Sequence, residues 1–149
     1  MPRFEVRTLI DAPIERVWAL LADWEGSAAW MVDATTVEVI GSLREGAGTR
    51  VRAVTRIAGI PLTDEMTVKR WEAPRLMVVK HHRAPIRGLA WFELTPSDRG
   101  VVFDWVEEID PPLGPLGELG GVVLRRPIAA VLAKSARKLK VLAEGRAPQ

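Results

Sequence analysis

Six short runs rich in β-branched residues, followed by one long segment with helical periodicity, constrain the fold of this chain more than any other feature. The runs lie near residues 35–41, 49–57, 62–71, 76–82, 88–95 and 101–109. They are separated by the turn sequences REGAG, AGIP, EAPR, RAPIRG and SDRG. Short β-branched runs between turns of this kind are typical of antiparallel strands. The middle of the chain therefore predicts an antiparallel sheet.

The two ends of the chain add one further strand and the helices. Residues 4–10 predict the first strand. A helix is expected to begin near Pro13, because the missing N–H of proline has no partner to lose at the first helical position. A second, short helix is expected over 27–31. After the loop DPPLGPLG, apolar residues three to five apart predict a long helix over about 116–144, with a kink or a late start at Pro127. The element order is that of an α+β protein.

Composition places the chain among globular proteins with one core. Its 149 residues are 48% hydrophobic and 27% charged, so we expect one domain over residues 1–149. The absence of cysteine excludes disulfides, thiolate metal sites and cysteine nucleophiles. No apolar run is long enough for a secretory signal or a membrane span, which predicts a cytoplasmic protein. The net charge of +2 is too small to indicate a nucleic-acid partner.

The chain resembles the START-related helix-grip (SRPBCC) superfamily in the opening segment IDAPIERVWALLADWEGSAAW, the strand-and-turn region, the hairpin WFELTPSDRGVVFDWVEEI and the long last helix. Within it, the closest similarity is to the polyketide cyclase/dehydrase and lipid-transport group. The resemblance spans nearly the whole chain. It implies a seven-stranded antiparallel sheet wrapped around the C-terminal helix, two short helices after the first strand, and an apolar cavity for a lipid, acyl, isoprenoid or polyketide-like ligand.

The SDRG turn predicts which residues of the last hairpin face inward. A four-residue loop over 97–100 pairs Leu94 with Phe103 and Phe92 with Trp105. A slip of one residue would mix apolar and acidic side chains on each face, so this register is favoured. Trp91, Glu93 and Asp104 are then expected to face outward.

The EAPR turn, treated in the same way, places Trp71 opposite Leu76, Val68 opposite Val79, and Met66 opposite His81. Together the two hairpins predict a ligand-binding wall, completed by one residue of the last helix: Met66, Val68, Arg70, Met77, Val79, Phe92, Leu94, Phe103, Trp105 and Ile128. The alternative is that these residues pack as an ordinary core. Arg70 is expected at the mouth of the pocket together with Asp64 and Arg83, either to recognise a polar ligand group or to form a rim of ion pairs.

His81 and His82 are the only histidines, and adjacent strand residues point to opposite faces. They cannot share one metal ion from a regular strand, and no H-x-H or H-E-x-x-H pattern occurs, so no metal site is expected. Inward-facing His81 is the candidate general acid or base, with Glu107 as its partner on the same face. The alternative is a histidine that is only hydrogen-bonded or solvated at the strand end.

Other motifs exclude further chemistry. No serine lies in a G-x-S-x-G elbow, and no glycine-rich loop fits a phosphate-binding pattern, so no cofactor is expected. The last helix is basic, which indicates either a solvated face or peripheral docking on an anionic membrane or a partner.

Three functions stay open at this point. The first is binding or transport of a small hydrophobic ligand, and the second is a polyketide cyclase or aromatase reaction catalysed by His81 and Glu107. The third is protein interaction through the basic last helix and exposed Trp91 or Trp71. The sequence does not determine the oligomeric state.

Overall fold

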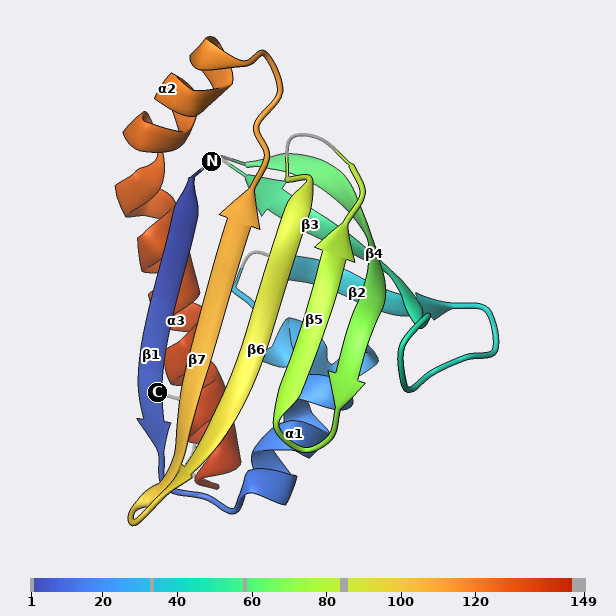
Figure 1. Ribbon diagram of the computed structural model, residues 1–149, viewed down its shortest axis with the longest axis vertical. Coiled ribbons are helices and arrows are strands. Elements are labelled where there is room, and N and C mark those ends of the chain that lie inside the picture. Colours follow the sequence, from blue (N-terminus) through green and yellow to red (C-terminus); the bar gives the residue numbers. More distant parts are fainter. Residues whose placement is uncertain (1, 33, 58, 84–85, 146–149) are drawn as a thin grey trace.

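The computed structural model describes residues 2–32, 34–57, 59–83 and 86–145, and these form a seven-stranded antiparallel sheet with the helices on one face (Figure 1). The strands are β1 (Arg3–Ile10), β2 (Ala34–Ile40), β3 (Arg50–Ile57), β4 (Ile60–Glu72), β5 (Leu76–His81), β6 (Gly88–Ser97) and β7 (Gly100–Ile109). The helices are α1 (Ile14–Ala22), the 3₁₀ helix η1 (Glu25–Ala29), α2 (Pro115–Val123) and α3 (Arg125–Ala143). The predicted fold class is confirmed.

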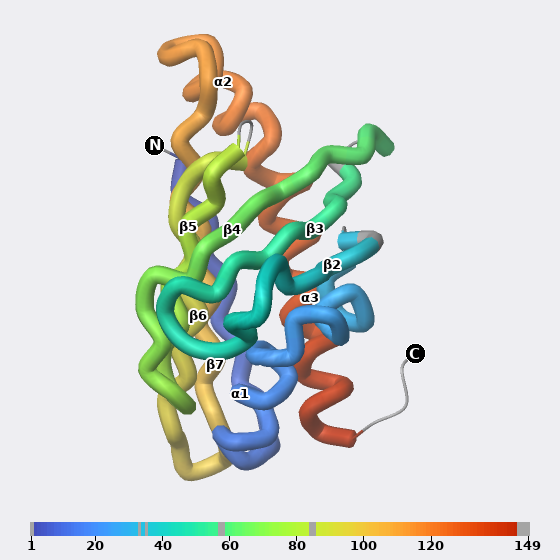
Figure 2. The backbone as a smooth tube through the Cα atoms, turned by 90° about the vertical axis from the view of Figure 1, so that its right-hand side faces the viewer, coloured from blue at the N-terminus to red at the C-terminus, as the bar shows by residue number. Residues whose placement is uncertain are grey.

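The strand order β1-β7-β6-β5-β4-β3-β2 follows from the turns. Each strand from β2 to β7 pairs with its neighbour in the chain, because short turns join antiparallel neighbours most easily. β1 completes the sheet beside β7, so the first and last strands lie together. Figure 2 shows β2, β3 and β4 bending across toward the side on which α3 lies. α3 packs against β1 and α1, and the inner face of the sheet carries the core.

The register predicted for the β6–β7 hairpin is confirmed, with Leu94 opposite Phe103 and Phe92 opposite Trp105. Phe103 is fully buried, whereas Glu93 is exposed on the other face. Trp91 faces outward as predicted and lies half-buried. Alternation and turn length are therefore sufficient to predict the register of a hairpin that contains no bulge.

The register predicted for the β4–β5 hairpin is right at one end and wrong at the other. Val68 pairs with Val79 and Met66 with His81, as predicted, but Trp71 pairs with Met77 instead of Leu76. The register shifts between Val68 and Arg70, which marks a β-bulge. One extra residue in a strand reverses the faces of every residue beyond it.

The bulge reverses the orientations of Arg70 and Trp71. Arg70 is exposed and forms an ion pair with exposed Glu72, so it does not belong to the inward-facing wall. Trp71 instead packs on the core, with its ring 5.2 Å from that of Trp18 in an edge-to-face arrangement. The expectation of an exposed Trp71 was wrong for the same reason.

The helices differ from the predictions at their boundaries. η1 begins at Glu25, before the expected start, and Ser27 lies inside it, buried, with its hydroxyl donating to the Asp23 carbonyl. The long C-terminal helix is interrupted at Leu124, which separates α2 from α3. Pro127 therefore falls in the first turn of α3, where its missing N–H leaves no hydrogen bond unmade.

Polar contacts fix the position of α3 over the sheet. The hydroxyl of fully buried Ser135 accepts a hydrogen bond of 3.0 Å from the backbone N–H of Val32. Closer to the C-terminal end of α3, the Lys140 ammonium donates to the Leu9 carbonyl at 2.6 Å and to Glu144 at 2.7 Å. These contacts tie the helix to β1 and to the segment after η1.

Candidate functional site

His81 is the last residue of β5, and alternation along that strand turns its ring inward. Its side chain is only 10% exposed. Nδ1–H donates a hydrogen bond of 2.8 Å to Oδ2 of Asp64, whose side chain is 6% exposed. Asp64 lies on β4 two residues before Met66, the cross-strand partner of His81. The two side chains therefore meet diagonally on the inner face of the sheet.

Glu107 of β7 lies on the other side of the His81 ring. Its Oε2 is 3.5 Å from Nε2 of His81, and its Oε1 accepts a hydrogen bond of 3.0 Å from the indole N–H of Trp105. Small Ala90, opposite both Val79 and Glu107, separates the two strands that carry these groups. We refer to Asp64, His81, Glu107 and Trp105 as the His81 cluster. No three His, Asp or Glu side chains in the described part of the chain, this cluster included, are arranged to hold a metal ion.

The charges of the cluster keep the His81 ring protonated. Burial alone would lower the pKa of His81, but attraction to Glu107 and the hydrogen bond to Asp64 outweigh it and raise the pKa from 6.5 to about 10. At neutral pH the ring is therefore an imidazolium, and both ring nitrogens carry a proton. Nδ1–H is bound to Asp64, whereas Nε2 is buried and makes no hydrogen bond to any described residue.

An aromatic wall adjoins the cluster. The rings of Phe92 and Phe103 stack with centroids 6.2 Å apart, and both lie against Trp105. Trp30 meets Trp105 edge to face, with centroids 5.8 Å apart. The indole N–H of Trp30 is buried without a hydrogen-bond partner among the described residues. The interior thus combines apolar area with buried N–H groups that make no hydrogen bond to a described residue.

Most residues predicted for the ligand-binding wall share this inner face. The fully or nearly fully buried members are Val68, Met77, Val79, Phe92, Leu94, Phe103 and Trp105. Met66 and Ile128 are half-buried and pack against the same core. His81 and Glu107 lie side by side, as the register predicted. Whether any of these residues contacts a ligand stays a prediction.

Asp64 and Arg83 were expected with Arg70 at a pocket mouth, and the structure separates them. Asp64 is buried against His81, while Arg83 is exposed and lies 3.5 Å from Glu65. Arg83 follows the end of β5, where strand alternation no longer determines the direction of a side chain. Of the three, only Asp64 belongs to the cluster.

Neither Asp64 nor Trp30 was expected beside His81. For Asp64 the signal was present, since the predicted pairing of Met66 with His81 puts residue 64 on the same face. For Trp30 there was none, because the helix expected over 27–31 is too short for periodicity to show which side chains are buried, and in the structure Trp30 lies after η1. A tertiary contact with Trp105 determines its position.

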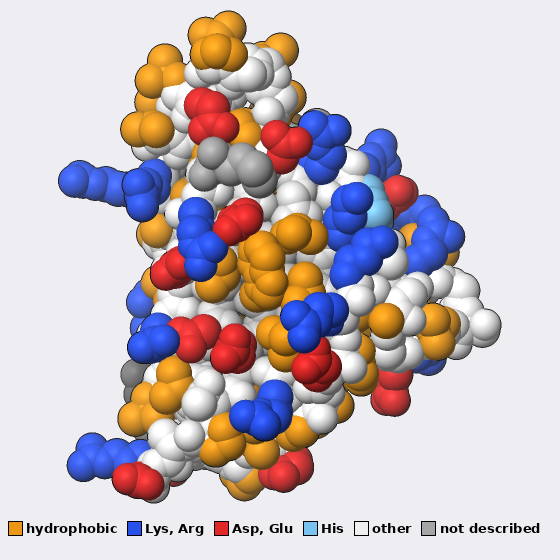
Figure 3. All heavy atoms as spheres, in the orientation of Figure 1, with side chains coloured by type: hydrophobic (Ala, Val, Ile, Leu, Met, Phe, Trp, Pro, Cys, Tyr) orange, Lys and Arg blue, Asp and Glu red, His pale blue; other side chains and the backbone are white. Residues whose placement is uncertain are grey.

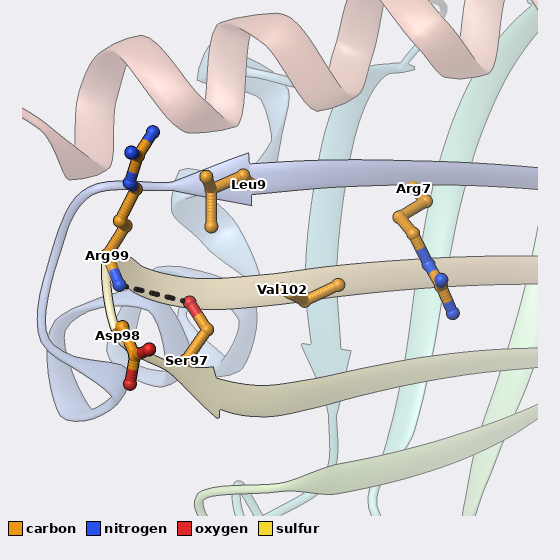
Figure 4. Close-up of a pocket in the computed structure, with 6 residues that line it drawn as sticks. All are labelled: Arg7, Leu9, Ser97, Asp98, Arg99 and Val102. Atoms are coloured by element: carbon orange, nitrogen blue, oxygen red, sulfur yellow. Dashed lines mark hydrogen bonds between the residues drawn. The ribbon is translucent and has the colours of Figure 1, made fainter.

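Two hollows on the described surface lie away from the His81 cluster. One is lined by Arg7, Leu9, Ser97, Asp98, Arg99 and Val102, at the turn that joins β6 to β7 (Figure 4). The other lies between β1 and the start of α3, against Arg3, Phe4, Glu5, Arg125 and Ala129. Neither hollow includes a wall residue of the predicted cavity. An open cavity between the sheet and α3 therefore stays a prediction.

An antiparallel sheet that wraps a long helix, with a polar cluster at the edge of an aromatic interior, defines a helix-grip domain. The family described as polyketide cyclase/dehydrase and lipid transport matches residues 1–144. The chain belongs to this family. No curated protein sequence matches it.

Solved structures with the same fold cover almost all of the chain. TTHA0849 from Thermus thermophilus superposes with a TM-score of 0.79 at 20% identity, over 93% of this chain and 94% of its own. The di-domain ARO/CYC StfQ from the steffimycin biosynthetic pathway gives a TM-score of 0.80 at 15% identity, over 97% of this chain and 51% of its own. The Aha1 dimer from Colwellia psychrerythraea gives 0.68 at 14% identity, over 97% of each chain. At these identities the similarity establishes the fold alone.

Proposed function

We propose that this protein binds a small, mainly apolar molecule that carries a carbonyl or hydroxyl oxygen, in the space between the sheet and α3. The observation that supports this most directly is Nε2 of His81. It belongs to a charged ring and is buried, and its contact with Oε2 of Glu107, at 3.5 Å, does not meet the geometry of a hydrogen bond. A buried donor without a hydrogen bond costs free energy, and a ligand oxygen at hydrogen-bond distance would lower that cost.

The wall can adapt to such a ligand. Met66 and Met77 lie on the inner face, and methionine side chains rearrange at low cost because they are unbranched and flexible. Apolar burial against the aromatic wall would supply affinity, at roughly 25 cal/mol per Å². The His81 N–H would then orient the ligand through its one polar group.

The protonation state of His81 favours binding over acid–base turnover. A general acid works best when its pKa lies near the working pH, so that it gives up and regains its proton easily. A pKa of about 10 keeps the proton on His81 at neutral pH. Such a ring is a permanent hydrogen-bond donor. We therefore place ligand binding or transport first.

A polyketide cyclase or aromatase reaction is the second candidate, supported by the short distance between Glu107 and His81 and by the family. In such a step Glu107 would take a proton from a carbon beside a ketone, and the electron pair of that C–H bond would form an enolate. The enolate carbon would attack a second carbonyl of the same chain, and the Nε2 proton of His81 would pass to the new alkoxide. Transfer of the proton from Glu107 to His81 would restore both groups. A His81→Gln variant would lose this turnover entirely.

A matched pair of probes tests the binding proposal. 1-Tetralone and tetralin have the same bicyclic skeleton and differ by one carbonyl oxygen. We expect tetralone to bind at least about tenfold more tightly, because a hydrogen bond to a charged donor contributes about 1.5–3 kcal/mol. Tryptophan fluorescence reports both affinities, and the carbonyl stretch of bound tetralone should shift to lower frequency.

The His81→Gln variant is the control for this experiment, after its folding has been checked by circular dichroism. It should bind tetralin as the wild type does and should lose the preference for tetralone. Equal affinities of the wild type for the two probes, or an unshifted carbonyl stretch, would contradict the proposal.

A further inference from the structure

α2 presents its apolar side chains to solvent. Leu116, Leu119 and Val123, which belong to the apolar positions of the predicted long helix, are 71%, 60% and 70% exposed. Leu113 and Val122 are also exposed, and no residue of α2 is buried. Figure 3 shows these apolar side chains gathered on the part of the molecule that projects beyond the sheet. An exposed apolar surface of this kind is typical of an interaction site.

The glycines of α2 explain why its apolar side faces out. A Cβ atom at Gly117 would lie 1.9 Å from the carbonyl oxygen of Pro112, and one at Gly121 would lie 2.4 Å from Cγ of Pro2. The helix can approach these prolines only through residues that have no side chain. The glycine side therefore lies against the preceding loop and Pro2, and the leucines and valines are left exposed.

Two arginines follow the apolar helix directly. Arg125 and Arg126 begin α3 and are exposed, and their side chains form no ion pair or hydrogen bond with another described residue. The nearby acidic residues Glu108 and Asp110 are instead paired, with Arg3 and Arg87. The apolar surface is thus bordered by positive charge that is available to an external anion.

We propose that α2 docks this protein on an anionic lipid bilayer, with its leucines and valines in the interface and Arg125 and Arg126 against lipid headgroups. Amphipathic segments bind membranes through this combination of apolar burial and attraction to anionic lipids. No helix in the described part of the chain has both the length and the apolar character needed to cross a bilayer. The contact is therefore peripheral.

A second copy of the chain fits this surface less well than a bilayer does. A dimer formed through α2 would place four arginine charges, from Arg125 and Arg126 of both copies, at an interface where Glu118 is the one acid that each α2 supplies. Like charges placed together disfavour such an interface. An anionic bilayer instead supplies both the apolar layer and the opposite charge.

The docking surface lies at the same end of the sheet as the His81 cluster (Figure 1). His81 pairs with Gly88, and Gly88 with Ile109. The N–H of Ile109 donates to the carbonyl of Pro2, the residue on which the glycine side of α2 packs. When the protein is docked, the end that holds the His81 cluster would therefore face the bilayer. Docking does not depend on the ligand proposal, and its test requires no pocket ligand.

Flotation of the full chain with lipid vesicles tests the proposal. We expect binding to phosphatidylcholine vesicles that contain about one third phosphatidylglycerol, and much weaker binding to phosphatidylcholine alone. The double variant Leu116→Asp/Leu119→Asp should bind at least about tenfold more weakly, since it removes two apolar side chains from the interface. Arg125→Glu/Arg126→Glu should abolish the preference for anionic vesicles and its dependence on salt.

Leu43→Asp is the matched control, because Leu43 is also exposed, at 48%, but lies in the loop between β2 and β3. It should bind vesicles as the wild type does, and thermal melts should show that all three variants are folded. Absence of wild-type binding, or equal binding by Leu116→Asp/Leu119→Asp, would overturn the proposal. So would gel filtration that shows these two substitutions splitting a dimer while the wild type ignores vesicles.

Discussion

Replacing Asp64 with alanine should lower the free energy of unfolding by about 3–5 kcal/mol, the usual effect of removing one partner of a buried ion pair. Asp64 accepts a hydrogen bond of 2.8 Å from Nδ1–H of His81, and both side chains are at most 10% exposed. Without it, the imidazolium keeps its charge and loses its only hydrogen bond to a described residue. Urea denaturation at neutral pH measures the effect.

Two variants distinguish the loss of the buried ion pair from the removal of an exposed carboxylate. Glu72 lies on the same strand but is exposed and paired with exposed Arg70, so Glu72→Ala should change the free energy of unfolding by less than about 1 kcal/mol. Asp64→Asn keeps the shape and an acceptor oxygen but not the charge. Its free energy of unfolding should lie between those of the wild type and Asp64→Ala. A change in Asp64→Ala no larger than in Glu72→Ala would show that the cluster contributes little to stability.

The stability of the protein should fall as the pH rises above about 6.5. The pKa of His81 is about 10 in the folded protein and 6.5 at its ordinary value, so the folded state holds a proton that the unfolded chain releases in this window. The stabilisation is therefore complete below about pH 6.5 and is lost as the pH rises through about 10. The slope is at most about 1.4 kcal/mol per pH unit for one proton. Denaturation midpoints measured across this range report it.

His82 provides a matched control for the pH dependence. It follows His81 in the chain but is exposed, with Nε2 bonded to the hydroxyl of Thr67 at 2.7 Å. His82→Gln should keep the wild-type slope above pH 6.5, whereas His81→Gln should flatten it. If both variants retained the slope, the proton would belong to another group and the charged state of His81 would be wrong.

The sequence predicts those parts of the fold in which a local rule acts without interruption. The register of the β6–β7 hairpin follows from its turn and from strict alternation. It places Glu107 on the inner face of the sheet, the face toward which His81 points. The bulge near Arg70 interrupts the same rule on β4. Alternation along one strand cannot show where a bulge inserts an extra residue, because the position of a bulge depends on contacts with the neighbouring strand. For that reason the predicted orientations of Arg70 and Trp71 were wrong.

α2 shows a second limit. Its apolar spacing predicts one apolar side, and the structure has one. Periodicity does not reveal whether that side meets the sheet or the solvent. The glycines at 117 and 121 decide the question, since they alone allow close packing against Pro112 and Pro2. A prediction that also considered the spacing of the glycines, and not only that of the large apolar residues, would have indicated that the apolar side of α2 faces outward.

We propose that the Nε2–H of His81 donates to a ligand oxygen in the cell. Native mass spectrometry of the protein purified gently from its own host, followed by organic extraction, tests that claim most directly. We predict a reproducible added mass that extracts as an apolar molecule containing a carbonyl or hydroxyl oxygen, and that is reduced or absent in His81→Gln. A wild-type protein that carries no added mass, or that carries a hydrocarbon without oxygen, would contradict it.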